Sequence, residues 1–185
     1  CSLIEADSAQ IEARVLAWLA RQEDLVEAFA TGEDVYKQMA SRIYGVPEED
    51  VTKDQRFVGK TTILGAGYGM GAVRFKAQVK NFGFDMGLDE ATQAIGMYRD
   101  INCEVRALWK EAQEVLASFT RQDAASLGRD GLITTDLKNE GLRLPSGLLL
   151  RYSDLRAEQT DRGFEYSYKT RKGRTRIYGG KVIEN

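Results

Sequence analysis

The chain has 185 residues, of which 43% are hydrophobic and 29% are charged, as expected for a globular protein large enough to bury a sizeable core. It contains no histidine, which excludes Ser-His-Asp and Cys-His nucleophile systems and histidine-ligated zinc. Its two cysteines form no cluster, so any bound metal is expected to be a hard, oxygen-ligated ion such as Mg²⁺.

The net charge of −2 is unevenly distributed along the chain. Residues 1–50 carry 11 acidic and 4 basic side chains, whereas residues 138–181 carry 11 basic and 5 acidic ones. The C-terminal part is therefore suited to meeting an anion. No signal peptide is recognisable, and no apolar run approaches the roughly 20 residues that a membrane helix needs. We therefore expect a cytoplasmic protein that is not secreted and has no membrane partner.

The first predicted element is a short buried strand, Ser2–Ala6, that ends at Asp7. From Ser8 to about Ala20 the apolar spacing is helical, and the residues expected to face the core are Ile11, Val15, Trp18 and Leu19. A carboxylate at a strand-to-helix junction is commonly a helix cap, and spacing alone favours that interpretation for Asp7. By the same default Glu12 is a solvated helix residue.

Helical spacing recurs over residues 23–30, 34–44, 72–80, 89–100 and 104–119. Between the second and third of these segments, Thr52 and Gln55 form a capping-box pattern at the start of another helix, which runs towards a glycine-rich exit at Gly69. Every fourth residue of this helix lies on one stripe, which carries Arg56, Lys60, Leu64 and, if the helix lasts that long, Tyr68. Two cations followed by an apolar residue and an aromatic ring suit a triphosphate at one end and a sugar and base at the other.

From Leu127 the apolar period changes to two, which predicts strands. Pro145-Ser-Gly147 is a turn signal between two of them. In the last hairpin, a two-residue loop at Lys172-Gly173 would place four cations on one face, namely Lys169, Arg171, Arg174 and Arg176. Like charges opposite each other are destabilising, so this face is expected to meet an external polyanion such as a nucleic-acid backbone. An edge hairpin whose cations deter aggregation is an equally good interpretation.

Two segments together resemble the family A (polymerase I-like) DNA polymerases. Asp7-Ser-Ala-Gln-Ile-Glu-Ala-Arg14 is similar to motif A of that family, D-x-S-x-I-E-x-R. Arg56-x-x-x-Lys60, followed by Gly65-x-x-Tyr68-Gly69, is similar to motif B. The resemblance is specific over residues 2–121 and weaker over the basic hairpins, while the ending at residues 178–185 is more similar to phage and environmental viral members.

The resemblance implies an α+β, mainly helical fold that comprises part of the palm and most of the fingers of a right-hand polymerase, with small antiparallel β-hairpins towards the C-terminus. Residues 1–50 would be a palm segment that carries motif A and leads into the fingers. Residues 51–121 would be the fingers helices with motif B, and residues 122–185 a β-hairpin insertion that returns towards the palm.

The resemblance also implies two-metal-ion nucleotidyl transfer, with Asp7 and the backbone carbonyl of Ser8 as ligands of two Mg²⁺ ions. Arg56 and Lys60 would join Asp7 as catalytic residues by binding the triphosphate. Glu12 would be the steric gate that excludes ribonucleotides, and Tyr68 would guard the nascent base pair. The full set of nucleotide-binding residues would be Ser8, Gln10, Ile11, Glu12, Tyr36, Arg56, Lys60, Leu64 and Tyr68.

The sequence departs from the family pattern at three places. The family usually has an aromatic residue where Leu64 stands, and a triphosphate-contacting histidine where Tyr36 stands. Motif C, a His-Asp-Glu turn that supplies the second metal carboxylate, is absent and is expected beyond residue 185. We therefore interpret the chain as an internal fragment of a longer polymerase, and expect these 185 residues alone to be inactive.

The implied partners are primer-template DNA and deoxynucleoside triphosphates, and the implied process is viral DNA replication in the host-cell cytoplasm. Nothing in the sequence indicates an oligomeric state. A single-subunit RNA polymerase is an alternative, which Glu12 argues against because a ribonucleotide enzyme needs a small residue near the 2′-hydroxyl. A non-catalytic nucleic-acid-binding module is the second alternative.

Overall fold

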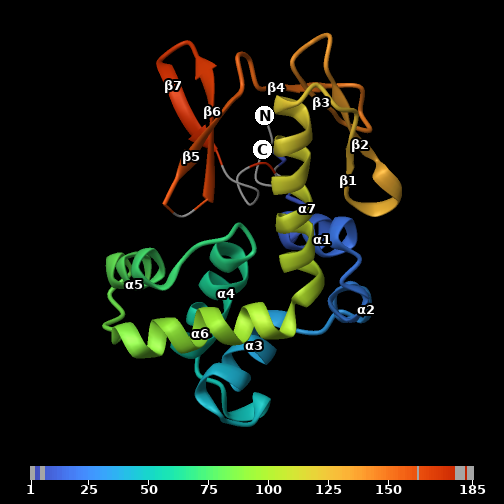
Figure 1. Cartoon of the computed structure of the whole chain (residues 1–185). Helices are drawn as coiled ribbons and strands as arrows, with labels where there is room; N and C mark the ends of the chain where they lie inside the picture. The colour runs from blue at the N-terminus through green and yellow to red at the C-terminus, as the bar shows by residue number, and fades with distance from the viewer. Residues whose placement is uncertain (1–2, 5–6, 162, 178–181, 183–185) are drawn as a thin grey trace.

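The structure is a computed structural model that describes residues 3–4, 7–161, 163–177 and 182 (Figure 1). Helices occupy the first two thirds of the chain, in the order α1 (Ile11–Ala20), α2 (Glu23–Thr31), α3 (Val35–Tyr44), η1 (Glu48–Asp50), α4 (Lys53–Ala66), α5 (Ala72–Asn81), α6 (Leu88–Ile101) and α7 (Cys103–Thr120). These bounds confirm the prediction of a mainly helical α+β fold. Within the described ranges, no helix has both the length and the apolar character that crossing a membrane requires.

Two small antiparallel sheets follow the helices. One contains β1 (Ser126–Leu127), β2 (Ile133–Asp136), β3 (Gly141–Arg143) and β4 (Leu149–Arg151) in sequence order, with the short helix η2 (Arg129–Gly131) between its first two strands. The other contains β5 (Arg156–Thr160), β6 (Gly163–Thr170) and β7 (Gly173–Ile177), also in sequence order. The turn predicted at Pro145-Ser-Gly147 joins β3 to β4, and Gly147 adopts the positive φ of 83° that the turn requires.

Helix α4 begins at the capping box that the sequence predicts. The hydroxyl of Thr52 accepts a hydrogen bond from the amide of Gln55 at 3.2 Å, and the side-chain oxygen of Gln55 accepts one from the amide of Thr52 at 2.9 Å. Two amides that the first helical turn would leave unpaired are thereby satisfied. The helix ends at Ala66, so Tyr68 lies in the turn that follows, and Gly69 completes that turn with a φ of 77°.

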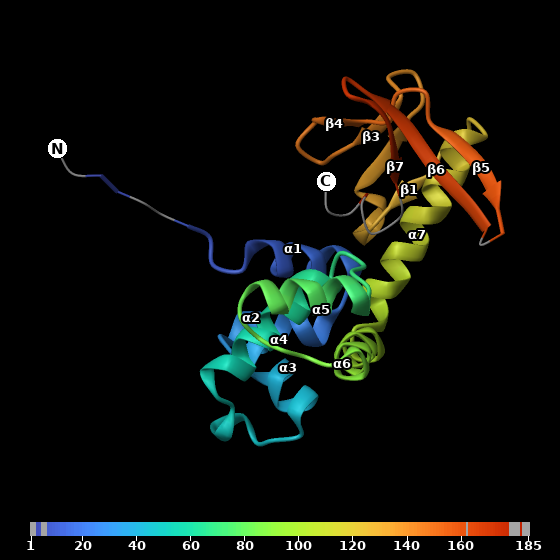
Figure 2. The same cartoon turned by 90° about the vertical axis from the view of Figure 1, so that its left-hand side faces the viewer.

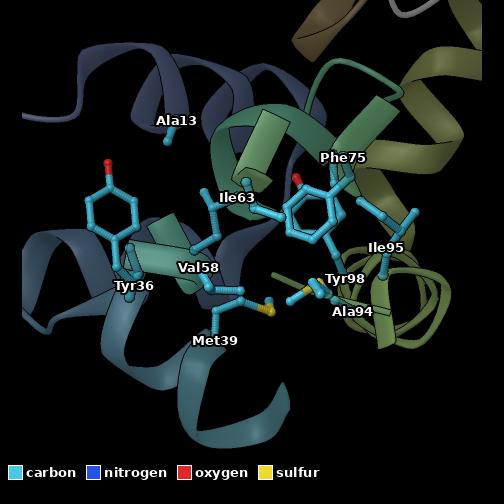
Figure 3. Packing of buried hydrophobic residues seen from close by; sticks show 14 of the residues in the cluster. Ala13, Tyr36, Met39, Val58, Ile63, Phe75, Ala94, Ile95 and Tyr98 are labelled. Atoms are coloured by element: carbon cyan, nitrogen blue, oxygen red, sulfur yellow. The ribbon is translucent and has the colours of Figure 1, made fainter. Parts of the chain in front are cut away.

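Helices α1 to α6 surround a first hydrophobic core, which we call the helical core. Its buried members include Met39 of α3, Val58 and Ile63 of α4, Phe75 of α5 and Tyr98 of α6 (Figure 3). Helices α3 and α4 approach especially closely at Gly59, where an added Cβ would lie 2.2 Å from the carbonyl oxygen of Tyr36. The lack of a side chain at Gly59 therefore sets the spacing of these two helices.

Helix α7 joins the helical part to both sheets, which lie on either side of its upper half in Figure 1. Its buried residues form a second core, the α7 core, with side chains from the two sheets: Val105, Leu108, Ala112, Val115 and Leu116 pack with Leu127, Leu142, Tyr166 and Ile177. Leu16 and Ala20 of α1 belong to the same core. Trp109 contacts both cores from its position on α7.

The expected inward face of α1 is wrong for three of its four residues; the fourth, Leu19, is half-buried and packs against the α7 core. Ile11, Val15 and Trp18 are 49%, 50% and 43% exposed, whereas the buried residues of the helix are Ala13, Leu16, Ala17 and Ala20. Small alanine side chains let α1 lie close to its neighbours, and only Leu16 contributes a large buried group. The apolar periodicity identified the helix, but the larger apolar residues do not mark its buried side.

The expected strand before Asp7 is also not seen where the structure describes the chain. Leu3 and Ile4 are 97% and 89% exposed and belong to no strand. The described residues that precede α1 lead away from the helices (Figure 2). A strand needs a neighbour to pair its backbone groups, and no described strand lies beside this segment. The rest of the predicted strand, residues 2 and 5–6, lies outside the described residues.

Candidate functional site

The stripe predicted on α4 exists as a helical surface. Lys60 is exposed, Arg56 and Leu64 are half-buried, and all three lie within the single helix Lys53–Ala66. The other side of the helix is buried at Val58, and Leu64 packs at the edge of the helical core. The helix therefore presents two cations to its surroundings while its opposite face anchors it.

The Arg56 side chain is held by a carboxylate that the sequence did not single out. Its Nε lies 2.6 Å from Oδ2 of Asp34, and the two side chains are 42% and 35% exposed. Asp34 is also the N-cap of α3, where its Oδ1 accepts a hydrogen bond from the amide of Lys37 at 3.1 Å. Burial alone would raise the pKa of Asp34, but the hydrogen bonds from Arg56 and Lys37 outweigh it and hold the pKa below its usual range.

The ring of Tyr36 lies beneath both cations of the stripe. The guanidinium carbon of Arg56 is 5.4 Å from the ring centroid, and Nζ of Lys60 is 6.0 Å from it. Both distances are within the range of a cation–π attraction. Tyr36 is only 4% exposed, and its hydroxyl points towards the side of α1 that carries Ala13 (Figure 3).

The electrostatic surroundings of Tyr36 include charged groups from α1 as well as from α4. Burial is the largest cause and raises the pKa of the Tyr36 hydroxyl. Arg56 and Arg14 oppose this rise in pKa, while the carboxylates of Asp34 and Glu12 add to it. Glu12 of α1 and Arg56 of α4 therefore act on the same phenol, although 44 positions separate them in the sequence.

The segment before α1 holds the remaining predicted motif A residues. Asp7 and Ser8 are exposed and precede the helix, so Asp7 is not its N-cap; that position belongs to Gln10, in the left-handed conformation with a φ of 60°. Ile11 and Glu12 occupy the first turn and are exposed. The helix-cap interpretation of Asp7 is thus wrong.

Arg14 fixes this segment against α2. Its Nε donates to the carbonyl of Ala9 at 3.1 Å, and its Nη1 donates to the carbonyl of Phe29 at 2.9 Å. Its guanidinium also lies 4.9 Å from the centre of the Phe29 ring. The arginine that ends motif A therefore has a structural task, which is to hold the backbone that leads from Asp7 into α1.

The far end of the stripe is fixed from α7. Nε1 of Trp109 donates a hydrogen bond to the carbonyl of Gly67 at 2.9 Å. An added Cβ at Gly67 would lie 2.8 Å from Leu16, so the turn that carries Tyr68 is closely packed. Burial raises the pKa of Tyr98 well above its usual value, and Tyr68 adds a smaller electrostatic contribution in the same direction.

No complete metal site is assembled in the part of the chain that the structure describes, where no group of three or more carboxylate or thiol ligands converges. Asp7 offers one exposed carboxylate, and the backbone of Ser8 offers a carbonyl beside it. Mg²⁺ commonly uses one or two protein carboxylates and completes its shell with water and substrate phosphates. Asp7 and Ser8 therefore fit part of such a shell.

The predicted cation cluster of the last hairpin is only partly correct. The loop residues are Arg171 and Lys172, not Lys172 and Gly173, because Thr170 pairs with Gly173 and Lys169 with Arg174. Neither loop residue has a positive φ, and Gly173 takes a φ of 119° immediately after them. The glycine therefore follows the turn, and Arg171 lies in the turn instead of opposite Arg174.

Two of the four cations are engaged within the sheet. Nη1 of Arg174 donates to the carbonyl of Asp154 at 3.0 Å and to that of Ser167 at 3.1 Å, and Nη2 contacts the Asp154 carboxylate. Arg176 pairs with Glu165 at 3.0 Å. Lys169 and Arg171 are exposed and form no ion pair with a described residue. These two cations are the ones that an external anion could reach without breaking an internal contact.

Comparison with known proteins finds a match to the family model of DNA polymerase family A over residues 1–140. The DNA polymerase of Bacillus phage SP02 is 31% identical over 196 aligned residues, which cover 97% of this chain and 29% of the phage protein. DNA polymerase I of Mycobacterium leprae is 45% identical over 78 residues, which cover 42% of this chain and 9% of that protein. The chain thus spans less than a third of the length of either relative.

A solved structure, described as the POL domain of Pol1 from M. smegmatis in complex with DNA primer-template and dNTP, is similar with a TM-score of 0.49 and 32% sequence identity. The similarity covers 65% of this chain and 20% of that one.

Proposed function

This chain belongs to DNA polymerase family A, and we propose that the complete protein extends a DNA primer by template-directed addition of deoxynucleotides. The observation that carries the proposal is the pair of motif B cations held over the ring of Tyr36, a residue whose surroundings include charged groups of α1. Arg56 and Lys60 lie over its ring, and Glu12 acts on its hydroxyl from α1.

In the proposed reaction, Arg56 and Lys60 bind the triphosphate of the incoming nucleotide. Charge develops on the pyrophosphate as it leaves, and two positioned cations stabilise that charge without any covalent step. Asp7 and the carbonyl of Ser8 would hold Mg²⁺, which when bound compensates the charge of the reacting phosphate oxygens. A second carboxylate ligand is expected from a part of the protein outside this chain.

The sugar and base of the nucleotide are proposed to lie between α1 and the C-terminal part of α4. Glu12 would exclude a 2′-hydroxyl, with Gln10 and Ile11 beside it at the start of α1. Leu64 offers an apolar but not planar surface to the sugar, and Tyr68 would lie next to the nascent base pair. The ring of Tyr36 packs against the two cations, but its phenol carries no positive charge that could bind the triphosphate.

We further propose that primer-template DNA contacts the last hairpin through Lys169 and Arg171. Because Arg174 and Arg176 already have carboxylate partners, their contribution to DNA binding is expected to be smaller than the sequence alone predicted. If the protein is viral, as its C-terminal residues suggest, the reaction takes place in the host-cell cytoplasm.

Primer extension by the complete protein tests the proposal. With Mg²⁺, a primer-template and dNTPs, we expect extension that Lys60→Ala reduces by at least tenfold, because each positioned cation contributes on the order of 1.4 kcal/mol or more to transition-state stabilisation. Lys110→Ala removes an exposed lysine of α7 and serves as the matched control. Extension that is equally fast in the Lys60 and Lys110 variants would rule out the proposed triphosphate site.

The preference for deoxynucleotides is tested in the same assay. Glu12→Ala should raise incorporation of rNTPs relative to dNTPs, because the side chain that blocks a 2′-hydroxyl is removed. A wild-type protein that prefers rNTPs would instead support an RNA polymerase. The isolated 185-residue chain should show no extension, and robust activity of that chain would refute its interpretation as a fragment.

A further inference from the structure

Asp34 is placed to do more than cap a helix. One of its carboxylate oxygens, Oδ1, accepts from the backbone amide of Lys37 at 3.1 Å, and the other, Oδ2, lies 2.6 Å from Nε of Arg56. The contact with the Lys37 backbone fixes the orientation of the carboxylate, so the oxygen that faces Arg56 is held in place. The carboxylate therefore links the start of α3 to the side chain of Arg56 and fixes their relative positions.

The contact uses only one edge of the guanidinium. Arginine has five N–H donors in a planar fork, and Asp34 takes the one on Nε. Among the described residues, no other hydrogen bond from the Arg56 side chain is present, so Nη1 and Nη2 remain for another acceptor. Two parallel donors are the geometry that binds a phosphate in a bidentate manner.

The frame that carries this contact is stiff. Tyr36, two residues after Asp34, supports the flat face of the guanidinium at 5.4 Å. Gly59 brings the backbones of α3 and α4 so close that a methyl group could not be inserted. Asp34, Tyr36 and Arg56 therefore keep one relative geometry, set by a helix cap, a buried ring and a close helix contact.

From this geometry we propose that Asp34 is a positioning residue for the nucleotide triphosphate: it holds Arg56 by Nε so that the two terminal amino groups face the phosphates. The inference rests on the proposed function and deepens it, because it assigns the arrangement of the triphosphate site to a carboxylate outside motifs A and B. A carboxylate near a phosphate would otherwise repel it, so its benefit comes from orienting the arginine. Preorganisation of this kind lowers the entropy lost on binding.

The ion pair has a second interpretation, which predicts the opposite effect of removing Asp34 on dNTP binding. If Asp34 competed with the triphosphate for Arg56, nucleotide binding would have to break the pair, and removing Asp34 would tighten binding. The engagement of Nε alone favours positioning, because both Nη groups can bind phosphate while the pair stays intact.

The test is the dissociation constant of a dNTP from the complete polymerase bound to a primer-template whose primer ends in a dideoxynucleotide, so that binding is measured without chemistry. Asp34→Ser keeps a good N-cap but is too short to reach Arg56, and we expect it to weaken dNTP binding about tenfold. Asp34→Asn can both cap and accept from Nε, and should restore most of the affinity. Asp54→Ser removes an exposed carboxylate from the first turn of α4 and is the matched control, with wild-type affinity.

A merely structural role for Asp34 is separated by two readouts. The affinity for primer-template DNA should be the same in Asp34→Ser and wild type, and in steady state the KM for dNTP should rise more than kcat falls. Unchanged or tighter dNTP binding by Asp34→Ser overturns the proposal, as does an equal loss in Asp34→Asn, which would show that charge and not position matters. A wild-type protein that binds dNTP but extends no primer would refute the proposed function, while the binding comparison would still decide the role of Asp34.

Discussion

Gly59 shows how one missing side chain organises the candidate site. An added Cβ would lie 2.2 Å from the carbonyl oxygen of Tyr36 and 2.9 Å from the amide nitrogen of Ala40, both backbone atoms that cannot move independently of α3. We therefore expect Gly59→Ala to separate α3 from α4 and to destabilise this region by about 3 kcal/mol. Hydrogen exchange of the α3 and α4 amides in the complete protein measures the effect.

Gly96 provides the matched control for this substitution. It also lies inside a helix, α6, but no atom comes within 4 Å of the position that its Cβ would take. Gly96→Ala should therefore stabilise its helix by about 0.5–1 kcal/mol, because alanine loses less backbone entropy than glycine. Similar exchange rates in the two variants would contradict the close approach at Gly59.

The Asp34–Arg56 pair makes a pH-dependent contribution to stability. Because the pKa of Asp34 is lowered in the folded protein, its stabilisation is fully present above the unfolded pKa of about 3.9 and is lost as the pH falls through the lower folded value. We expect Asp34→Ala to be less stable than wild type at pH 7, and the difference to shrink steadily below about pH 4. Amide exchange of α3 at several pH values, corrected for the intrinsic rates, measures it, and a difference that stays constant down to pH 2 would contradict the pair.

At the scale of an element, the β6–β7 hairpin carries two paired cations, Arg174 and Arg176, and two exposed ones, Lys169 and Arg171, which we propose contact DNA. Lys169→Ser together with Arg171→Ser should weaken binding of primer-template DNA by the complete protein. If both contact phosphates, the slope of log K against log salt should fall by roughly 2. Filter binding or fluorescence anisotropy at several salt concentrations gives the slope, and Lys110→Gln on α7 is the control that should leave it unchanged. An unchanged slope in the double variant would instead support the interpretation that the hairpin is a sheet edge whose cations deter aggregation.

The elements differ in how far their sequence determined them. Helix α4 was predictable because Thr52 and Gln55 form a local capping box, and the β3–β4 turn because Gly147 supplies a positive φ. The register of β6 and β7 was not predictable, because a glycine can lie within a turn or directly after it. Gly173 lies directly after the turn. The buried side of α1 was largely missed because three of its four buried residues are alanines, which carry little hydrophobic signal.

For the candidate site, the sequence predicted helix positions that the structure confirms, but not the contacts that the side chains make there. The spacing of Arg56 and Lys60 placed them on one helix face, and motif A supplied Glu12. The contact between Asp34 and Arg56 could not be predicted from the sequence, because it depends on how closely α3 packs on α4. The sequence pattern of an N-cap also does not show that the second carboxylate oxygen is available for another contact. The contact of the Tyr36 ring with Arg56 and Lys60 likewise depends on the close packing of α3 and α4 at Gly59.

At the scale of the whole molecule, Trp109 connects the helical core to the α7 core. Its ring contacts both cores, and its Nε1 donates to Gly67 at the end of α4, next to Tyr68. Trp109→Phe keeps most of the apolar contact but leaves the buried Gly67 carbonyl without this donor, which should cost about 1–2 kcal/mol. The change should therefore speed hydrogen exchange at the C-terminal end of α4 as well as in α7. Trp18→Phe, at an exposed position of α1, should alter neither region. Faster exchange confined to α7 would mean that the motif B turn does not depend on α7, whereas faster exchange in both elements would make α7 the support that holds Tyr68 in place.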